Sequence, residues 1–197
     1  TVRELLKYDG IKSIKMIEID EAVVEASKKF LPKISRGLTH PKVDLKIADG
    51  IEFVKNCKES EFDIIIVDGS DPVGPAEGLF SNEFYANCFK ALKPQGALIT
   101  QGESPMFHQE TFVELNQSLK TIFGKEKVHT LLFHATTYPS GMWSLQMAVK
   151  GSQHPYKEIN FSKIQEFCEK ENLHYYTADL HRASFALPKF VQQLISY

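Results

Sequence analysis

The sequence predicts an α/β fold with a doubly wound, mostly parallel sheet and a C-terminal antiparallel hairpin. Segments with strand character alternate with segments of helical periodicity through the first two thirds of the chain, which is typical of repeated β-α-β units. Residues 62–67 form a nearly continuous apolar run, as strands buried on both faces do. Further on, two strand-like segments flank a turn at residues 138–141, which indicates the hairpin.

The individual elements follow from these patterns in chain order. Residues 1–8 have the apolar spacing of the inside of an amphipathic helix, and Pro32 and Pro94 follow the ends of two later helices. Residues 68–78 are rich in Gly, Pro and Asp, so we expect a loop there. The expected strands are residues 13–19, 43–47, 62–67, 97–101, 128–135 and 144–149. The expected helices are residues 21–30, 51–57, 82–92, 110–123, 161–169 and 188–195.

Composition excludes several classes of protein. Of the 197 residues, 43% are hydrophobic and 24% are charged, which is ordinary for a globular domain and argues against disorder. The net charge of −2 and the lack of a Lys/Arg run give no footprint for nucleic acid. No apolar stretch approaches the roughly 20 residues that span a bilayer, and no secretory leader is visible. We therefore expect neither a nucleic-acid partner nor a membrane partner.

The cysteines and histidines predict no metal site. Cys57, Cys88 and Cys168 are scattered, lie in helical patterns and are odd in number, which argues against a disulfide framework. The seven histidines show no ligand spacing. A reducing, cytoplasmic setting fits this usage best.

Acidic residues follow three of the predicted strands. Ligands of parallel α/β sheets bind beyond the carboxyl ends of the strands, so these acids are candidate site residues. Glu18 is placed to accept hydrogen bonds from the hydroxyls of a ribose, whereas Asp20 fits better as a helix cap. Asp49 is equally compatible with accepting from an adenine amine and with capping a helix, and Gly50 lets backbone approach a flat base.

The loop that begins at Asp68 is the most informative segment. Asp68 and Asp71 lie three residues apart among two glycines and two prolines, which give the loop a defined shape. Metal binding would need further oxygen ligands, and a turn-capping role for Asp68 is also open. We favour a third role, binding a cationic amine and helping to remove its proton, because a carboxylate beside an ammonium stays ionised and attracts it.

Six segments, taken in order, resemble those of the spermidine synthases and related polyamine aminopropyltransferases. They cover nearly the whole chain, and the most specific is the Asp68 loop. The six segments are residues 18–20, 49–50, 66–76, 101–105, 137–141 and 175–188.

The resemblance implies a Rossmann-like, methyltransferase-type fold and a reaction. Decarboxylated S-adenosylmethionine, as co-substrate, would donate its aminopropyl group to the diamine putrescine, giving spermidine and methylthioadenosine without a metal or a tightly bound cofactor. The full-length protein would be a homodimer or homotetramer. The nucleoside would contact Glu18, Ile19, Asp49, Gly50 and Pro75. Asp68 would be the catalytic residue, and Asp71, Gln101 and Tyr138 would line the diamine site.

The chain departs from the family pattern at its beginning. The family's Gly-rich turn and its N-terminal β-rich domain are absent from these residues, so we interpret residues 1–197 as one catalytic nucleoside-binding domain that is truncated at its N-terminus. We expect this piece alone to bind nucleoside poorly and to turn over slowly or not at all. A putrescine N-methyltransferase that uses S-adenosylmethionine, a catalytically silent partner subunit and a generic nucleotide-binding module remain open alternatives.

Three other residues are ambiguous in the sequence. Glu103 is either an amine contact or a solvated loop acid. Trp143 either walls the amine site or, as we favour, is a core aromatic residue. His181 is expected to be structural.

Overall fold

The computed structural model describes residues 1–69, 74–157 and 159–196. By its internal contacts the chain divides into two compact units, Thr1–Asn56 and Cys57–Tyr197. A single domain over the whole chain stays a prediction.

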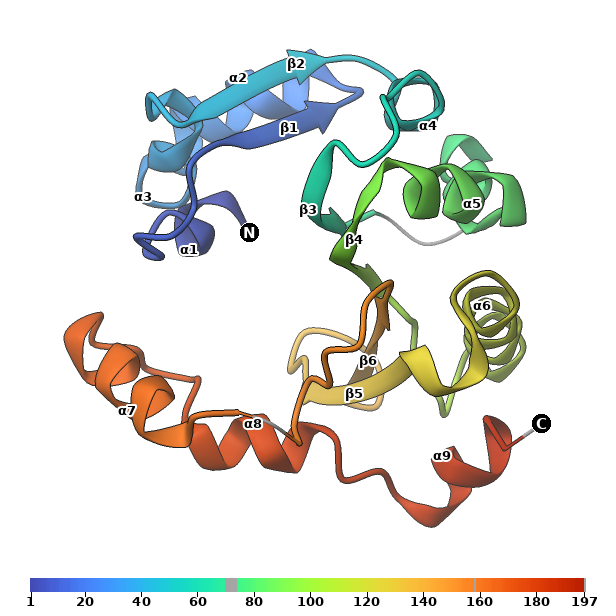
Figure 1. Ribbon diagram of the computed structural model, residues 1–197. Helices are drawn as coiled ribbons and strands as arrows, with labels where there is room; N and C mark the ends of the chain where they lie inside the picture. The colour runs from blue at the N-terminus through green and yellow to red at the C-terminus, as the bar shows by residue number, and fades with distance from the viewer. Residues whose placement is uncertain (70–73, 158, 197) are drawn as a thin grey trace. The chain divides into compact units, whose positions relative to one another are not determined.

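The first unit is a small α/β unit built on two parallel strands. Its elements are α1 (Val2–Leu5), β1 (Ile14–Glu18), α2 (Glu21–Phe30), α3 (Pro32–Ser35), η1 (Arg36–Thr39), β2 (Val43–Ile47) and α4 (Gly50–Lys55) (Figure 1). The pairing of β1 with β2 runs from Ile14 opposite Val43 to Glu18 opposite Ile47. Because the strands are parallel, their carboxyl ends lie at the same edge of this sheet. The segments that follow Glu18 and Ile47 therefore leave from one side.

The second unit holds a four-stranded sheet and the larger core. Its first elements are β3 (Phe62–Val67), η2 (Gly74–Phe80), α5 (Asn82–Ala91), β4 (Leu92–Gln101) and α6 (Gln109–Phe123). The remaining elements are η3 (Lys125–Lys127), β5 (Val128–His134), β6 (Met142–Val149), α7 (Phe161–Lys170), α8 (Ala178–Ser184) and α9 (Lys189–Leu194).

The sheet of the second unit confirms the predicted strand directions. Its order is β3-β4-β6-β5. Strands β3 and β4 are parallel, whereas β6 is antiparallel to both β4 and β5. Three of the four strands thus run the same way, and β5 with β6 forms the predicted C-terminal hairpin. The α/β fold class is confirmed.

Strand β4 is longer than predicted. It begins at Leu92, directly after α5, instead of at residue 97. Leu92 pairs with Phe62 and Ala97 with Ile64, and the register shifts between them. Pro94 therefore lies in an irregular stretch, where a residue without an N–H breaks no regular ladder. The segment around Pro94, which was predicted only to end α5, is thus already part of β4.

Other differences concern short helical segments. The opening helix spans only Val2–Leu5 instead of the eight residues predicted. Helix α4 ends at Lys55, so Cys57 lies outside it. Helix α8 was not predicted, although the Thr177 hydroxyl caps it by accepting from the Leu180 N–H at 3.0 Å. Short helices carry too few periodic positions to stand out in a sequence. The remaining short segments that were not predicted are α3, η1, η2 and η3.

The hydrophobic core of the second unit lies between its sheet and the helices α5 and α6. These two helices pack against each other, and α6 also contacts β5 and β6 (Figure 1). The side chains of Tyr85, Cys88, Leu98, Phe112 and Leu119 are fully buried. This packing fixes the position of β4, whose carboxyl end carries the candidate site.

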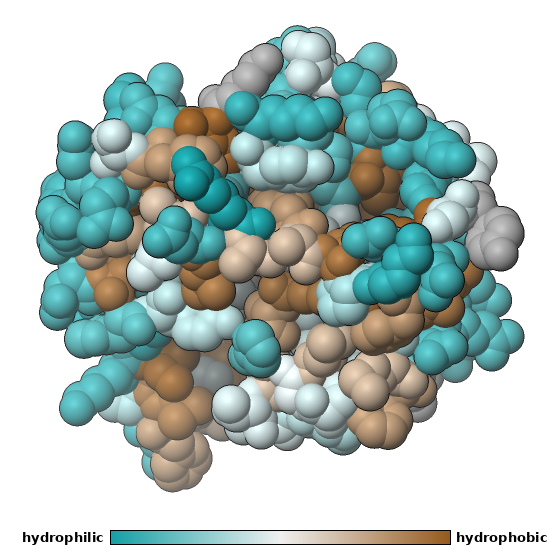
Figure 2. Space-filling model, turned by 90° about the horizontal axis from the view of Figure 1, so that it is seen from below, coloured by the Kyte–Doolittle hydropathy of each residue, from teal (hydrophilic) through white to brown (hydrophobic). Residues whose placement is uncertain are grey.

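Apolar side chains also reach the surface. In the space-filling view they lie at several places among hydrophilic residues (Figure 2). Exposed examples are Phe30, Ile34 and Phe107. Among the residues described here, no helix has the length and apolarity that a membrane crossing requires.

Candidate functional site

The carboxyl edge of the first sheet carries two of the predicted nucleoside contacts. Glu18 is the last residue of β1, and its backbone carbonyl accepts from the Ala48 N–H at 2.9 Å. Asp49 therefore follows immediately after a residue that is hydrogen-bonded to Glu18. The structure thus brings the two predicted acids to the same edge of one small sheet.

Local hydrogen bonds hold these carboxylates in place. Glu18 Oε1 accepts from the Asp20 N–H at 3.0 Å, and Asp49 Oδ1 accepts from the Ile51 N–H at 2.8 Å. A carboxylate has about four acceptor positions, so these contacts leave capacity for a ligand. Asp49 is the N-cap of α4; the capping role is confirmed, and the adenine contact stays a prediction.

Asp20 caps the other helix of this edge. Its Oδ1 accepts from the N–H groups of Ala22 and Val23 at the start of α2, as expected from the sequence. Ile19, which lies between Glu18 and Asp20 in the sequence, is 62% exposed. Gly50 is the first residue of α4, and a Cβ added there would meet no atom within 4 Å. An exposed apolar residue, Ile19, thus follows Glu18, and a glycine with free space around it, Gly50, follows Asp49.

The second sheet sets the carboxyl ends of β3 and β4, which lead to Asp68 and Gln101, side by side. Val67 pairs with Thr100 in the parallel register of β3 and β4, and Asp68 and Gln101 are the residues that follow. Asp68 is exposed and Gln101 is half-buried. Asp71 lies outside the described residues. Pro75 belongs to η2, but its side chain is likewise outside the described set.

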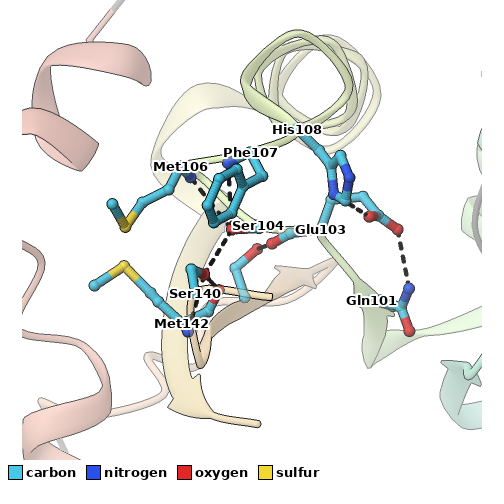
Figure 3. Close-up of polar contacts among 9 residues, drawn as sticks. Gln101, Glu103, Ser104, Met106, Phe107, His108, Ser140 and Met142 are labelled. Atoms are coloured by element: carbon cyan, nitrogen blue, oxygen red, sulfur yellow. Dashed lines mark hydrogen bonds and ion pairs between the residues drawn. The ribbon is translucent and has the colours of Figure 1, made fainter. Parts of the chain in front are cut away.

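Glu103 is the site residue that the sequence left ambiguous. It is 1% exposed, so the solvated-acid interpretation is wrong. Its Oε1 accepts from Gln101 Nε2 at 2.9 Å, and its Oε2 lies 2.9 Å from His108 Nδ1. Figure 3 shows the carboxylate between these two side chains. Both oxygens of the buried acid therefore have a partner, as a buried charge requires.

The backbone around Glu103 has an uncommon conformation. Its φ is +63°, in the left-handed region that few non-glycine residues adopt. The Ser144 hydroxyl and N–H both donate to the Glu103 carbonyl, at 2.8 and 3.1 Å. Gly102 allows this approach, because a Cβ there would lie 2.6 Å from Ser144 Oγ. Strand β6 thus holds the turn that follows β4.

Aromatic contacts extend this cluster to Tyr138. The His108 ring meets Trp143 edge-on at 5.7 Å between centroids, and Tyr138 packs on Trp143 at 4.5 Å. Trp143 is 3% exposed, so the core interpretation is confirmed, while Tyr138 is 45% exposed. A continuous chain of contacts therefore joins Gln101 to Tyr138, two residues that lie far apart in the sequence.

Ser104, in the turn after β4, makes a second set of contacts beside this cluster. Ser104 Oγ lies 3.2 Å from Ser140 Oγ, and it also accepts from the Met106 and Phe107 N–H groups at 3.4 Å (Figure 3). The turn after β4 and the turn between β5 and β6 are thus linked by side chains as well as by the sheet.

The sequence reasoning missed His108 as a member of this cluster. A signal was present, because an acid and a histidine five residues apart follow directly after a buried strand. His181 is structural, as expected: its ring nitrogens lie 2.6 Å from Tyr176 Oη and 2.8 Å from the Pro155 carbonyl. Within residues 1–69, 74–157 and 159–196, no group of three or more His, Cys, Asp or Glu could hold a metal ion.

Comparison with known proteins gives the family. The spermine/spermidine synthase domain matches residues 1–162. A polyamine aminopropyltransferase of Alkaliphilus metalliredigens is 44% identical over 197 residues, which are 99% of this chain and 67% of that protein.

Solved structures agree with this match. A spermidine synthase in complex with the transition-state analogue AdoDATO superposes with a TM-score of 0.93 at 37% identity, over 100% of this chain and 65% of that one. The spermidine synthase of Thermotoga maritima gives 0.90 at 37% identity, over 100% and 64%. The chain thus spans about two thirds of the length of these relatives.

Proposed function

This chain belongs to the spermine/spermidine synthase family, and we propose that the protein containing it transfers an aminopropyl group from decarboxylated S-adenosylmethionine to putrescine. The products are spermidine and methylthioadenosine. The curated relative is a polyamine aminopropyltransferase, and a solved relative binds a transition-state analogue. The observation that carries the proposal is the pairing of Val67 with Thr100, the residues directly before Asp68 and Gln101.

The chemical difficulty lies in the nucleophile. The sulfonium is a good leaving group, so no metal or covalent intermediate is required. An alkyl amine has a pKa near that of lysine, about 10, so exposing its lone pair at pH 7 costs about 4 kcal/mol. The site must therefore favour the neutral form of the reacting nitrogen while it holds the other nitrogen as a cation.

Asp68 would act on the reacting nitrogen. Its carboxylate accepts the proton that the amine loses, as a general base does. The amine nitrogen forms a bond to the aminopropyl carbon, the carbon–sulfur bond breaks, and its electron pair converts the sulfonium to the thioether of methylthioadenosine. Holding the amine nitrogen in line with the aminopropyl carbon lowers the activation barrier further by proximity.

The other site residues would bind the two substrates. Asp71, Gln101 and Tyr138 would line the diamine site. Glu18 would accept from the ribose hydroxyls, Asp49 from the adenine amine, and Ile19, Gly50 and Pro75 would border the base. The exposure of Ile19 and the shared edge of Glu18 and Asp49 support these assignments.

A homodimeric or homotetrameric assembly and a cytoplasmic location also stay proposals. The scattered positions and odd number of the cysteines support a reducing compartment.

The test is a donor-and-acceptor assay. Protein expressed from the complete coding sequence that contains these residues is incubated with putrescine and either decarboxylated S-adenosylmethionine or S-adenosylmethionine. We expect methylthioadenosine and spermidine from the first donor and no methylputrescine from the second. Methyl transfer would instead identify a putrescine N-methyltransferase, and methylthioadenosine binding without turnover would identify a silent subunit.

A further inference from the structure

We propose that Glu103 is a positioning residue that turns the Gln101 side-chain amide so that its oxygen, and not its NH2 group, is presented to the cationic substrate. The inference rests on the proposed function, because it assigns Gln101 to the diamine site. It adds a role for a buried carboxylate that itself touches no reacting atom in the proposed mechanism.

The first step concerns the two ends of an amide. Glutamine carries an acceptor oxygen and a donor NH2 group on opposite sides of one carbon, and it can present either end. An ammonium group is a donor only. Only one of the two orientations of Gln101 therefore suits a polyamine, and the reverse orientation would oppose N–H groups to N–H groups.

The second step is the selection of one orientation by Glu103. A carboxylate accepts hydrogen bonds and donates none. Glu103 Oε1 lies 2.9 Å from Gln101 Nε2. The flipped amide would place an oxygen against a carboxylate oxygen at that distance, which is repulsive. The Gln101 oxygen is consequently turned away from Glu103.

The third step is the rigidity of the carboxylate. Glu103 is 1% exposed, and its second oxygen is 2.9 Å from His108 Nδ1. The Ser144 hydroxyl and N–H fix its carbonyl. His108 is held in turn by its edge contact with Trp143. The acceptor that orients Gln101 therefore has little freedom to follow a flip (Figure 3).

Glu103 could also act on the substrate simply through its charge, and a double-mutant cycle separates the two effects. An orienting effect needs the Gln101 amide, whereas an effect of charge does not. The variants are Glu103→Met, Gln101→Ala and the double variant, made in the protein expressed from the complete coding sequence. Methionine keeps the length of the side chain but offers no carboxylate or amide oxygen to Gln101. The matched control is Glu169→Met, which removes the carboxylate from an exposed Gln165–Glu169 pair joined at 2.8 Å.

We expect Glu103→Met to raise KM for putrescine about tenfold with kcat changed less than about threefold, as the loss of one oriented hydrogen bond implies. In the Gln101→Ala background the same substitution should change KM by less than about twofold. Glu169→Met should leave both constants unchanged. An equal factor in both backgrounds would overturn the proposal, and so would a wild-type KM in Glu103→Met.

A spectroscopic measurement tests the orientation without turnover. In the nitrogen–proton spectrum of the wild-type protein, the side-chain NH2 of Gln101 is assigned by its absence in Gln101→Ala. We expect one of its protons to be shifted downfield by the bond to Glu103, and the shift to vanish in Glu103→Met. Two protons at the positions of free glutamine would overturn the proposal.

The kinetic cycle and the spectrum distinguish a failure of the proposed function from a failure of the proposed role of Glu103. If the wild-type protein transfers no aminopropyl group, the proposed function fails, while the spectrum still decides the orientation of Gln101. If Glu103→Met does not fold, the wild-type spectrum decides alone.

Discussion

Asp68 and Gln101 occupy corresponding positions at the ends of neighbouring parallel strands, because each directly follows one member of the Val67–Thr100 pair. Neither residue is near the other in sequence. From Gln101, contacts run through Glu103, His108 and Trp143 to Tyr138. This edge of the second sheet therefore gathers the residues proposed to handle the amine.

Replacing Asp68 by Asn should separate amine chemistry from nucleoside binding. The substitution keeps the shape but removes the proton acceptor, so the rate of methylthioadenosine release should fall by about 10²–10⁴-fold. The affinity for methylthioadenosine, measured by titration calorimetry, should stay unchanged. Asp63→Asn is the matched control, since Asp63 is an exposed acid within β3, the strand that Asp68 follows, and it pairs with Lys93. Equal rates for both variants would remove Asp68 from the mechanism.

The helix-capping role of Asp49 and its proposed contact with adenine can be tested separately. Serine caps helices about as well as aspartate, so Asp49→Ser should change the free energy of unfolding by less than about 0.5 kcal/mol, whereas Asp49→Ala should lower it by about 1 kcal/mol. Both variants should weaken methylthioadenosine binding, because both lose the carboxylate. Urea denaturation and calorimetry measure the two effects. Asp20→Ala serves as a control that loses only a cap, and undiminished binding in Asp49→Ser would limit Asp49 to capping.

Gly102→Ala should destabilise the turn after β4. The added Cβ would lie 2.6 Å from Ser144 Oγ and 3.0 Å from Gln146 Cγ, and both neighbours belong to the packed strand β6. Overpacking of this kind costs about 1–3 kcal/mol. Gly10→Ala is the control, because no atom lies within 4 Å of its added Cβ. Thermal or urea denaturation measures the difference, and equal stability of the two variants would contradict the close approach.

His129 should make the protein less stable in mild acid. Burial, followed by the charges of His154 and Lys157, lowers the pKa of His129 to about 4, whereas in the unfolded chain it is about 6.5. The unfolded state therefore binds more protons between these values. The free energy of unfolding should be highest above pH 6.5 and should fall as the pH drops to 4. Because His129 is only half-buried and solvent screens its charge, the loss should be smaller than the roughly 3 kcal/mol that the full shift implies.

Urea denaturation at pH 7 and at pH 4.5 measures this dependence. His129→Gln should reduce it, whereas His174→Gln, which changes an exposed histidine, should not. The same pH dependence in wild type and His129→Gln would assign the effect to other groups.

The thiols should differ in reactivity. Burial raises the pKa of the Cys88 thiol to about 12, and Cys88 is fully buried. The thiolate is the reactive form, so iodoacetamide at pH 8 should label Cys88 only after unfolding. Cys57 is half-buried and should react in the folded protein. Mass spectrometry of the labelled peptides gives the answer, and equal labelling rates would contradict the burial of Cys88.

Much of the fold could be predicted because its signals are local. The apolar run of β3 and the periodicity of α2 gave bounds that agree with the structure. The Asp20 cap was predictable for the same reason, since it depends on three adjacent residues. The long strand β4 was missed in part, because its first half is irregular and pairs with β3 across a register shift.

The sequence by itself determined the α/β class, the hairpin, the family resemblance and the acids that end the strands, all of which depend on neighbouring residues. Only the tertiary structure decided that Glu103 is buried and that it joins Gln101 to His108. The burial of a carboxylate depends on strands that pack around it from distant parts of the chain, and no local pattern of charge or hydrophobicity records that packing.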